Sequence, residues 1–136
     1  MPENNKILFV CVENAGRSQM AEAFFKKYSS GKFQAISAGT IPANKVNPIV
    51  VQAMKEVGID LSAETPKSIT ESTIHESFKT VNMGCMDKKS CPALFTKDIL
   101  DWGIEDPKGR SIEEVRIIRD DIESKVKKFI QKLEAS

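Results

Sequence analysis

A cysteine, an arginine and a serine stand close together where a short apolar run gives way to a helical pattern. The run Ile7-Leu8-Phe9-Val10 has the length and composition of a buried strand. Cys11 follows it at once, and five residues separate Cys11 from Arg17. A loop of this size that enters a helix turns backbone N–H groups inward, and these groups bind anions together with the helix dipole. The spacing therefore predicts an oxyanion-binding loop.

The side chains of this stretch suit nucleophilic chemistry on such an anion. Arg17 offers a planar fork that donates two hydrogen bonds to a tetrahedral oxyanion. Cys11 would lie at the base of the loop, where positive potential favours the nucleophilic thiolate. Ser18 would hydrogen-bond this sulfur or cap the helix. A cysteine at a strand end is often only a small buried apolar residue, but the strand, Gly16 in the loop and the helix beyond favour a catalytic role.

Composition narrows the class of protein. The 136 residues, 40% of them hydrophobic, predict a single domain over residues 1–136 with a substantial core. No apolar run is long enough to cross a bilayer and the first five residues do not resemble a signal peptide, so we expect a cytoplasmic protein. A net charge of +1 argues against a general nucleic-acid role. Three cysteines do not fit a secreted disulfide scaffold and favour redox or catalytic use.

Strand and helix patterns alternate along the chain. Periodicity and turn residues predict strands over residues 6–10, 33–37, 79–83 and 99–102, and helices over 18–29, 47–57, about 69–75 and from 111 towards the end. Ser111 and Glu114 form a capping box at the start of the last helix. This alternation predicts an α/β fold, with a four-stranded parallel sheet and helices on both faces.

Ligands of such sheets bind beyond the carboxyl ends of the strands. Cys11, Cys85 and Asp106 each follow a predicted strand, so we expect them to converge at one edge. Asp106 precedes Pro107, a pair that locally indicates an ordinary surface turn. A carboxylic acid at this edge would also serve as a general acid that protonates a departing oxygen. Glu105 is the weaker candidate for that role.

Cys85 and Cys91 are separated by five polar or flexible residues. Zinc would need four ligands, and the chain has one histidine, His75, so we expect no metal. The two cysteines are otherwise either structural thiols or a redox pair. A flexible segment would let their Cα atoms approach to the ~5.5 Å that a disulfide needs. The residues alone leave these two alternatives open.

The stretch from Cys11 to Ser18 resembles the phosphate-binding loop of the low-molecular-weight protein tyrosine phosphatases. It equally resembles that of the thioredoxin-coupled arsenate reductases, which share the fold. The resemblance extends from Lys6 to about Lys132 and implies a Rossmann-like sheet. Both families place an Asp-Pro acid on a loop before the last helix, which matches Asp106. The resemblance also implies that the oxyanion is bound by the loop residues Val12, Glu13, Asn14, Ala15, Gly16 and Arg17.

Cys85 and Cys91 lie where the reductases carry two further cysteines, so the resemblance favours an arsenate reductase. It implies that Cys11 attacks arsenate while Asp106 protonates the departing oxygen. Cys85 then attacks the sulfur of Cys11 and releases arsenite, and Cys91 attacks Cys85. Thioredoxin or a similar dithiol reductant would reduce the resulting Cys85–Cys91 disulfide. The family chemistry needs no cofactor, and we expect a monomer.

Two other functions remain as alternatives. In a tyrosine phosphatase, Cys11 would attack phosphorus, with Asp106 as the general acid. Lys108, however, stands where that family usually has an aromatic residue for the phosphotyrosine ring, and Glu13 would repel an acidic phosphopeptide. A non-catalytic oxyanion-binding protein is the third possibility, but the complete set of Cys11, Arg17 and Asp106 argues against it.

Some of the reductases resembled here bind potassium near the loop. Asn14, Glu22 and Ser37 match positions of that site, but Lys67 stands where such members have an acid. The ammonium of Lys67 could take the place of the ion, so the sequence does not predict bound potassium.

Overall fold

The computed structural model describes residues 5–84 and 99–135. Four strands form one sheet in the order β2-β1-β3-β4, and every pairing is parallel. The strands are β1 (Lys6–Cys11), β2 (Gln34–Gly39), β3 (Ser77–Asn82) and β4 (Ile99–Asp101). The predicted α/β fold with a four-stranded parallel sheet is therefore confirmed.

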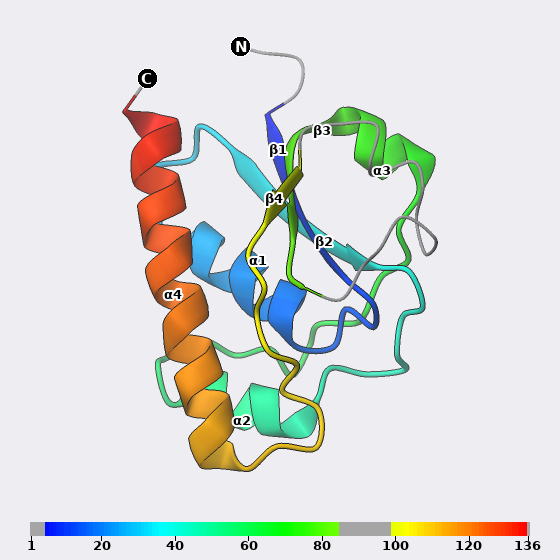
Figure 1. The fold of residues 1–136 in the computed structure, drawn as a ribbon, viewed down its shortest axis with the longest axis vertical. Helices are drawn as coiled ribbons and strands as arrows, with labels where there is room; N and C mark the ends of the chain where they lie inside the picture. Colours follow the sequence, from blue (N-terminus) through cyan, green and yellow to red (C-terminus); the bar gives the residue numbers. More distant parts are fainter. Residues whose placement is uncertain (1–4, 85–98, 136) are drawn as a thin grey trace.

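The helices lie on both faces of the sheet, as the alternation of elements predicted (Figure 1). They are α1 (Arg17–Tyr28), α2 (Pro48–Lys55), α3 (Glu71–Glu76) and α4 (Ile112–Glu134). Because side chains alternate along a strand, Ile7 and Phe9 of β1 face the larger core with α1, α2 and α4. Leu8 and Val10 face the smaller core with Ile74 of α3.

Local capping explains where two of the helices begin. The Asn47 side chain accepts the Ile49 N–H at 3.0 Å, and Pro48 is the first residue of α2. The Ser111 Oγ accepts the Glu114 N–H at 3.2 Å and lies 3.2 Å from Glu114 Oε1. The capping box predicted from the sequence is therefore present at α4.

The chain beyond β4 continues along the end of β3 before it turns into α4. The Trp102 N–H donates to the Asn82 carbonyl, and the Ile104 N–H to the Met83 carbonyl, each at 3.0 Å. This pairing directs the residues before α4 past the start of α1, near the loop that follows β1 (Figure 1). The carboxyl end of β1 and the segment that carries Asp106 therefore meet at one edge of the sheet. No helix in the described part of the chain is long and apolar enough to cross a membrane.

Candidate active site

Cys11 is the last residue of β1, and 2% of its surface is exposed. Its Sγ accepts the Asn14 N–H at 3.2 Å and lies 2.9 Å from Ser18 Oγ. Asn14 has a φ of 52°, a left-handed conformation that asparagine tolerates better than most residues. This conformation turns the chain back over the sulfur, so that residues 11–17, the oxyanion loop, curve around Cys11.

Asn14 and Ser18 support the loop from behind, and both are completely buried. The Asn14 Nδ2 donates to Ser18 Oγ at 2.7 Å, and the Ser18 hydroxyl has a proton to donate to Cys11 Sγ when that sulfur is a thiolate. Asn14 Oδ1 accepts from Gln19 Nε2 at 3.0 Å and from the Lys67 N–H at 2.8 Å. Gly16 is the N-cap of α1 and Ser18 lies inside the helix, so the alternative that Ser18 caps the helix was wrong.

Arg17 begins α1, and only 5% of its side chain is exposed. Its Nη1 donates to the Ile104 carbonyl at 3.0 Å, and its Nη2 lies 3.8 Å from Asp106 Oδ2. Asp106 is half-exposed, and its Oδ1 accepts the Lys108 N–H at 3.0 Å. Residues 104–110, the acid loop, are thus attached to the guanidinium. Of the three residues predicted to converge at this edge, Cys11 and Asp106 do so, and Cys85 lies outside the described residues.

These three residues line one pocket of about 480 Å³. Three segments form its walls: the oxyanion loop, residues 43–48 that lead into α2, and the acid loop. The two loops pack tightly, since a Cβ on Gly16 would lie 2.8 Å from Pro107 Cγ. Five of the six loop residues expected to bind the oxyanion line the pocket: Val12, Glu13, Ala15, Gly16 and Arg17. Asn14 does not line it and instead holds the loop in place from behind.

The charged side chains that line the pocket include one more base than acid. Arg17, Lys45 and Lys108 line it, against the acids Glu13 and Asp106. Lys108 Nζ lies 3.0 Å from Glu13 Oε2, and this carboxylate raises the pKa of the lysine. The first-turn N–H groups of α1, which have no partner within the helix, begin at the same loop. The arrangement suits a small oxyanion with a nucleophilic sulfur beneath it.

The surroundings of Glu22 show whether this chain could hold the potassium ion that some of the similar arsenate reductases bind. Glu22 is 5% exposed, and its carboxylate accepts from Ser37 Oγ at 2.6 Å and from Lys26 Nζ at 2.5 Å. Lys67 Nζ lies 3.8 Å from the oxygen that Ser37 binds. Two ammonium groups already offset the charge of Glu22, so these residues do not fit a potassium site. Within residues 5–84 and 99–135, no group of three His, Cys, Asp or Glu side chains clusters as metal ligands would.

Of the four other candidate residues, the structure describes Glu105 and His75. Cys85 and Cys91 fall outside the described residues. Glu105 is exposed and its Oε2 lies 3.6 Å from Arg110 Nη1, whereas Asp106 is the carboxylate beside Arg17. His75 is exposed in the last turn of α3.

Several contributors to the site were not identified from the sequence. Gln19 supports Asn14, the Ile104 carbonyl anchors Arg17, and Gly39 leaves room for the oxyanion loop. A Cβ on Gly39 would lie 2.5 Å from the Val12 carbonyl oxygen. None of these residues gave a signal in the sequence, and Gln19 falls on the side of the helical pattern opposite Met20, Phe24 and Tyr28.

Comparison with known proteins places the chain in a family. Residues 6–136 match the family model described as low molecular weight phosphotyrosine protein phosphatase. An arsenate reductase of Brevibacillus brevis is 40% identical over 131 residues, which cover 95% of this chain and 97% of that protein. A glutaredoxin arsenate reductase of Synechocystis is 34% identical and covers 94% of this chain and 98% of its own length. The chain belongs to the low-molecular-weight phosphotyrosine protein phosphatase family.

Solved structures agree with this assignment. An arsenate reductase in its phosphate-binding state superposes with a TM-score of 0.83 at 35% identity and covers 93% of this chain and 97% of its own. An arginine phosphatase from Geobacillus stearothermophilus superposes with a TM-score of 0.84 at 27% identity, over 96% of this chain and 93% of its own. The solved structures that this chain resembles thus include both a reductase and a phosphatase.

Proposed function

We propose that the protein is an arsenate reductase of the thiol-relay type. The observation that carries this proposal is the pocket in which Cys11, Arg17 and Asp106 meet. Curated relatives that are 34–40% identical over nearly the whole chain are named arsenate reductases. We also propose that residues 1–136 form one domain that acts as a monomer in the reducing cytoplasm.

In the first step, the oxyanion loop and Arg17 hold arsenate above the sulfur of Cys11. The thiolate attacks arsenic, and an As–S bond forms as an As–O bond breaks. Asp106, beside Arg17 at the pocket wall, gives its proton to the departing oxygen, which leaves as water. The hydrogen bonds from Asn14 and Ser18 hold Cys11 in its place for this attack.

The second step moves two electrons to arsenic. The Cys85 thiolate attacks the sulfur of Cys11, the As–S bond breaks, and its electron pair stays on arsenic, which departs as arsenite. Cys91 then attacks Cys85, so that Cys11 is released as a thiolate and a Cys85–Cys91 disulfide remains. These roles of Cys85 and Cys91 rest on the resemblance, since both lie outside the described residues.

A dithiol reductant must return two electrons to that disulfide. Thioredoxin is our first candidate, and the glutaredoxin arsenate reductase of Synechocystis supports a glutaredoxin system as the other. The relay involves cysteine sulfur alone, so neither a metal nor an organic cofactor belongs to the proposed chemistry.

Arsenate-dependent NADPH oxidation in the presence of thioredoxin and thioredoxin reductase tests this function. We expect turnover by the wild-type protein and none by Cys85→Ser or Cys91→Ser. Replacing thioredoxin with glutathione and glutaredoxin identifies the reductant. Turnover that survives in both serine variants would contradict the relay.

A phosphatase is the second candidate, which the superposition on an arginine phosphatase favours. Arsenate and phosphate are both tetrahedral oxyanions, and the pocket does not distinguish them by shape. In a phosphatase, Cys11 would attack phosphorus and water would later release phosphate. This alternative would be established if all three proteins, wild type, Cys85→Ser and Cys91→Ser, hydrolyse p-nitrophenyl phosphate at equal rates and none turns over arsenate.

A further inference from the structure

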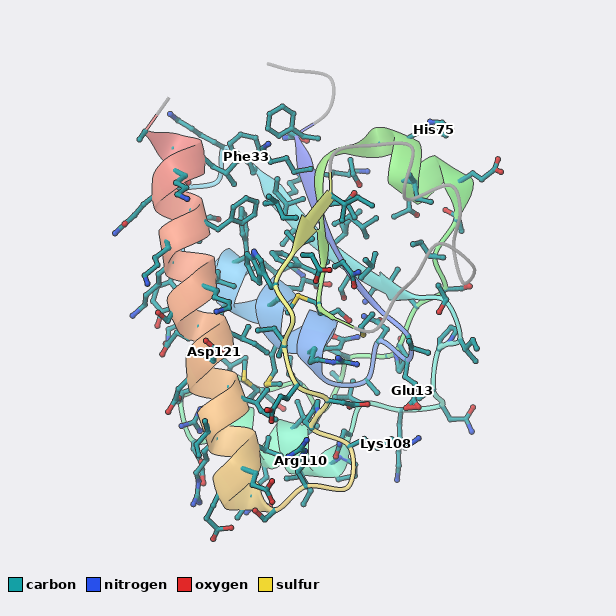
Figure 2. All side chains as sticks on the ribbon, viewed as in Figure 1. Glu13, Phe33, His75, Lys108, Arg110 and Asp121 are labelled. Atoms are coloured by element: carbon teal, nitrogen blue, oxygen red, sulfur yellow. The ribbon has the colours of Figure 1, made fainter. Side chains whose placement is uncertain are left out.

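A second pocket lies at the opposite end of the sheet from the oxyanion loop. It has a volume of about 750 Å³, within the usual range for sites of small molecules. Figure 2 shows Phe33, one of its lining residues, far from Glu13 and Lys108 at the mouth of the first pocket. Its walls come from the segment before β2, from β3, β4 and Trp102, and from the last turns of α4.

Aromatic side chains form much of the surface of this pocket. Phe33 and Phe78 stack with ring centroids 5.5 Å apart, and Trp102 meets Phe129 edge-on at 5.7 Å. Phe78 is 49% exposed and Leu100 is 39% exposed, although both are large apolar residues. An apolar group that covers them would gain free energy in proportion to the area it removes from water.

The charges around the aromatic surface are mostly of one sign. Four lysines line the pocket, Lys79, Lys125, Lys128 and Lys132, against the single acid Asp101. Lys125 also pairs with Asp121, which does not line the pocket, at 3.2 Å. Asp101 Oδ1 accepts the Gly103 N–H at 3.2 Å. The whole chain has a net charge of only +1, so the lining of this pocket is more positive than the chain as a whole. A ligand that matches the pocket must therefore combine an apolar body with a negative group.

We propose that this pocket binds a small amphipathic carboxylate, with a medium-length alkyl or aryl body. The body lies against Phe33, Phe78 and Trp102, and the carboxylate lies among the lysines of α4. A second copy of the chain fits poorly, because a two-fold contact would bring the same lysines of both copies together. The site is separate from the Cys11 pocket and does not depend on the function proposed for it.

Trp102 provides a direct readout, since it is the only tryptophan of the chain and lines the pocket. We would titrate the full-length protein with decanoate, below its micelle concentration, and follow Trp102 fluorescence. Decyltrimethylammonium is the control ligand, because it carries an alkyl chain of ten carbons and a positive charge in place of the carboxylate. We expect a saturable change with decanoate and a response at least tenfold weaker with the cation.

Two adjacent lysines of α4 supply matched variants. Lys128 lines the pocket, whereas Lys127 lies outside it, 4.7 Å from the Tyr28 ring. We expect Lys128→Glu to weaken decanoate binding by at least fivefold and Lys127→Glu to change it by less than twofold. Phe78→Ser should also weaken it, and Cys11→Ser should leave it unchanged because Cys11 belongs to the other pocket.

Several results would overturn the proposal. They are the absence of a saturable response, equal binding of the cation and the anion, and equal effects of the two lysine variants. Decanoate binding that phosphate abolishes would assign the signal to the Cys11 pocket instead. If sedimentation shows dimers of the wild type that Lys128→Glu loses, a second copy of the chain occupies the surface. If the protein binds anionic vesicles but not free decanoate, a membrane surface occupies it.

Discussion

Lys108 Nζ lies 3.0 Å from Glu13 Oε2, so an ion pair joins the acid loop to the oxyanion loop at the edge of the pocket. Figure 2 shows the two residues side by side. The lysine offsets a carboxylate that would otherwise repel an incoming oxyanion. Lys108 therefore makes the pocket more favourable for arsenate or phosphate than Glu13 alone would.

Lys108→Met should weaken phosphate binding, because it leaves the Glu13 carboxylate uncompensated. We expect a change below about fivefold, since both side chains are partly exposed to solvent. This binding is measured by how strongly phosphate slows the alkylation of Cys11 by iodoacetamide. Both proteins would also carry Cys85→Ser and Cys91→Ser, so that Cys11 is the only thiol that reacts. Adding Glu13→Gln to Lys108→Met should restore part of the loss. If the double variant binds no better than Lys108→Met, the compensation argument is wrong.

Arg17→Lys should abolish most activity, because one ammonium cannot replace the two arms of the guanidinium. Nη1 is already engaged by the Ile104 carbonyl, and Nη2 points towards Asp106. A lysine would lose at least one hydrogen bond to a charged group, so we expect a loss of roughly 10- to 100-fold in turnover. Arg110→Lys, at the exposed end of the acid loop, is the control and should retain activity. Near-normal turnover of Arg17→Lys would contradict the assigned role.

Lys67→Met should make the protein sensitive to potassium. Glu22 is nearly buried, and removal of one of its two lysines leaves its charge less well offset. We expect the Tm to fall by roughly 2–4 °C, as for a loss of about 1 kcal/mol. Potassium chloride should then raise the Tm of the variant more than choline chloride does, with no such difference in the wild type. If the two salts change the Tm of wild type and of Lys67→Met in the same way, the ammonium of Lys67 does not take the place of a potassium ion.

Gly39→Ala should disrupt the oxyanion loop, because its Cβ would lie 2.5 Å from the Val12 carbonyl oxygen and 2.9 Å from the Asn14 nitrogen. Overpacking of this kind costs about 1–3 kcal/mol, and we expect phosphate protection of Cys11 to be lost as well. Gly58→Ala is the matched control. Its φ is 82° with nothing within 4 Å of the added Cβ, so it should lower stability and leave phosphate binding intact. Equal phosphate binding by the two variants would refute the close-approach argument.

Glu56→Gln should lower stability at neutral pH and have little effect in acid. A hydrogen bond from Arg116 lowers the pKa of Glu56 from 4.5 to about 2, with further help from Arg119. A carboxyl whose pKa is lower in the folded state stabilises the fold above its unfolded pKa. That contribution is lost as the pH falls from about 4.5 to about 2.

Urea unfolding at pH 7, 5 and 3 measures this dependence. The difference between wild type and Glu56→Gln should be similar at pH 7 and 5 and smaller at pH 3. Glu64→Gln, a change at an exposed glutamate, controls for the general loss of negative charge. A difference that stays constant over the whole range would show that the ion pair does not cause it.

The sequence alone determined those parts of the site that depend on local structure. A strand, a loop with five residues between Cys11 and Arg17, and a helix occur in that order along the chain, and they fold together as predicted. The periodicities of the strands and helices likewise predicted the parallel sheet. The convergence of Asp106 with Cys11 followed from the rule that parallel strands end at the same edge.

Only the tertiary structure decided which distant residues support the site. Lys67 reaches Asn14 through its backbone N–H, and Ile104 holds Arg17 through its carbonyl, so neither side chain could show these roles in a sequence pattern. The aromatic pocket was missed for a similar reason. Phe33 and Phe78 are far apart in the chain and come together only through the sheet, whereas the lysines of α4 looked like an ordinary solvated face. Periodicity reports on neighbours within one element, and contacts between elements depend on how those elements pack.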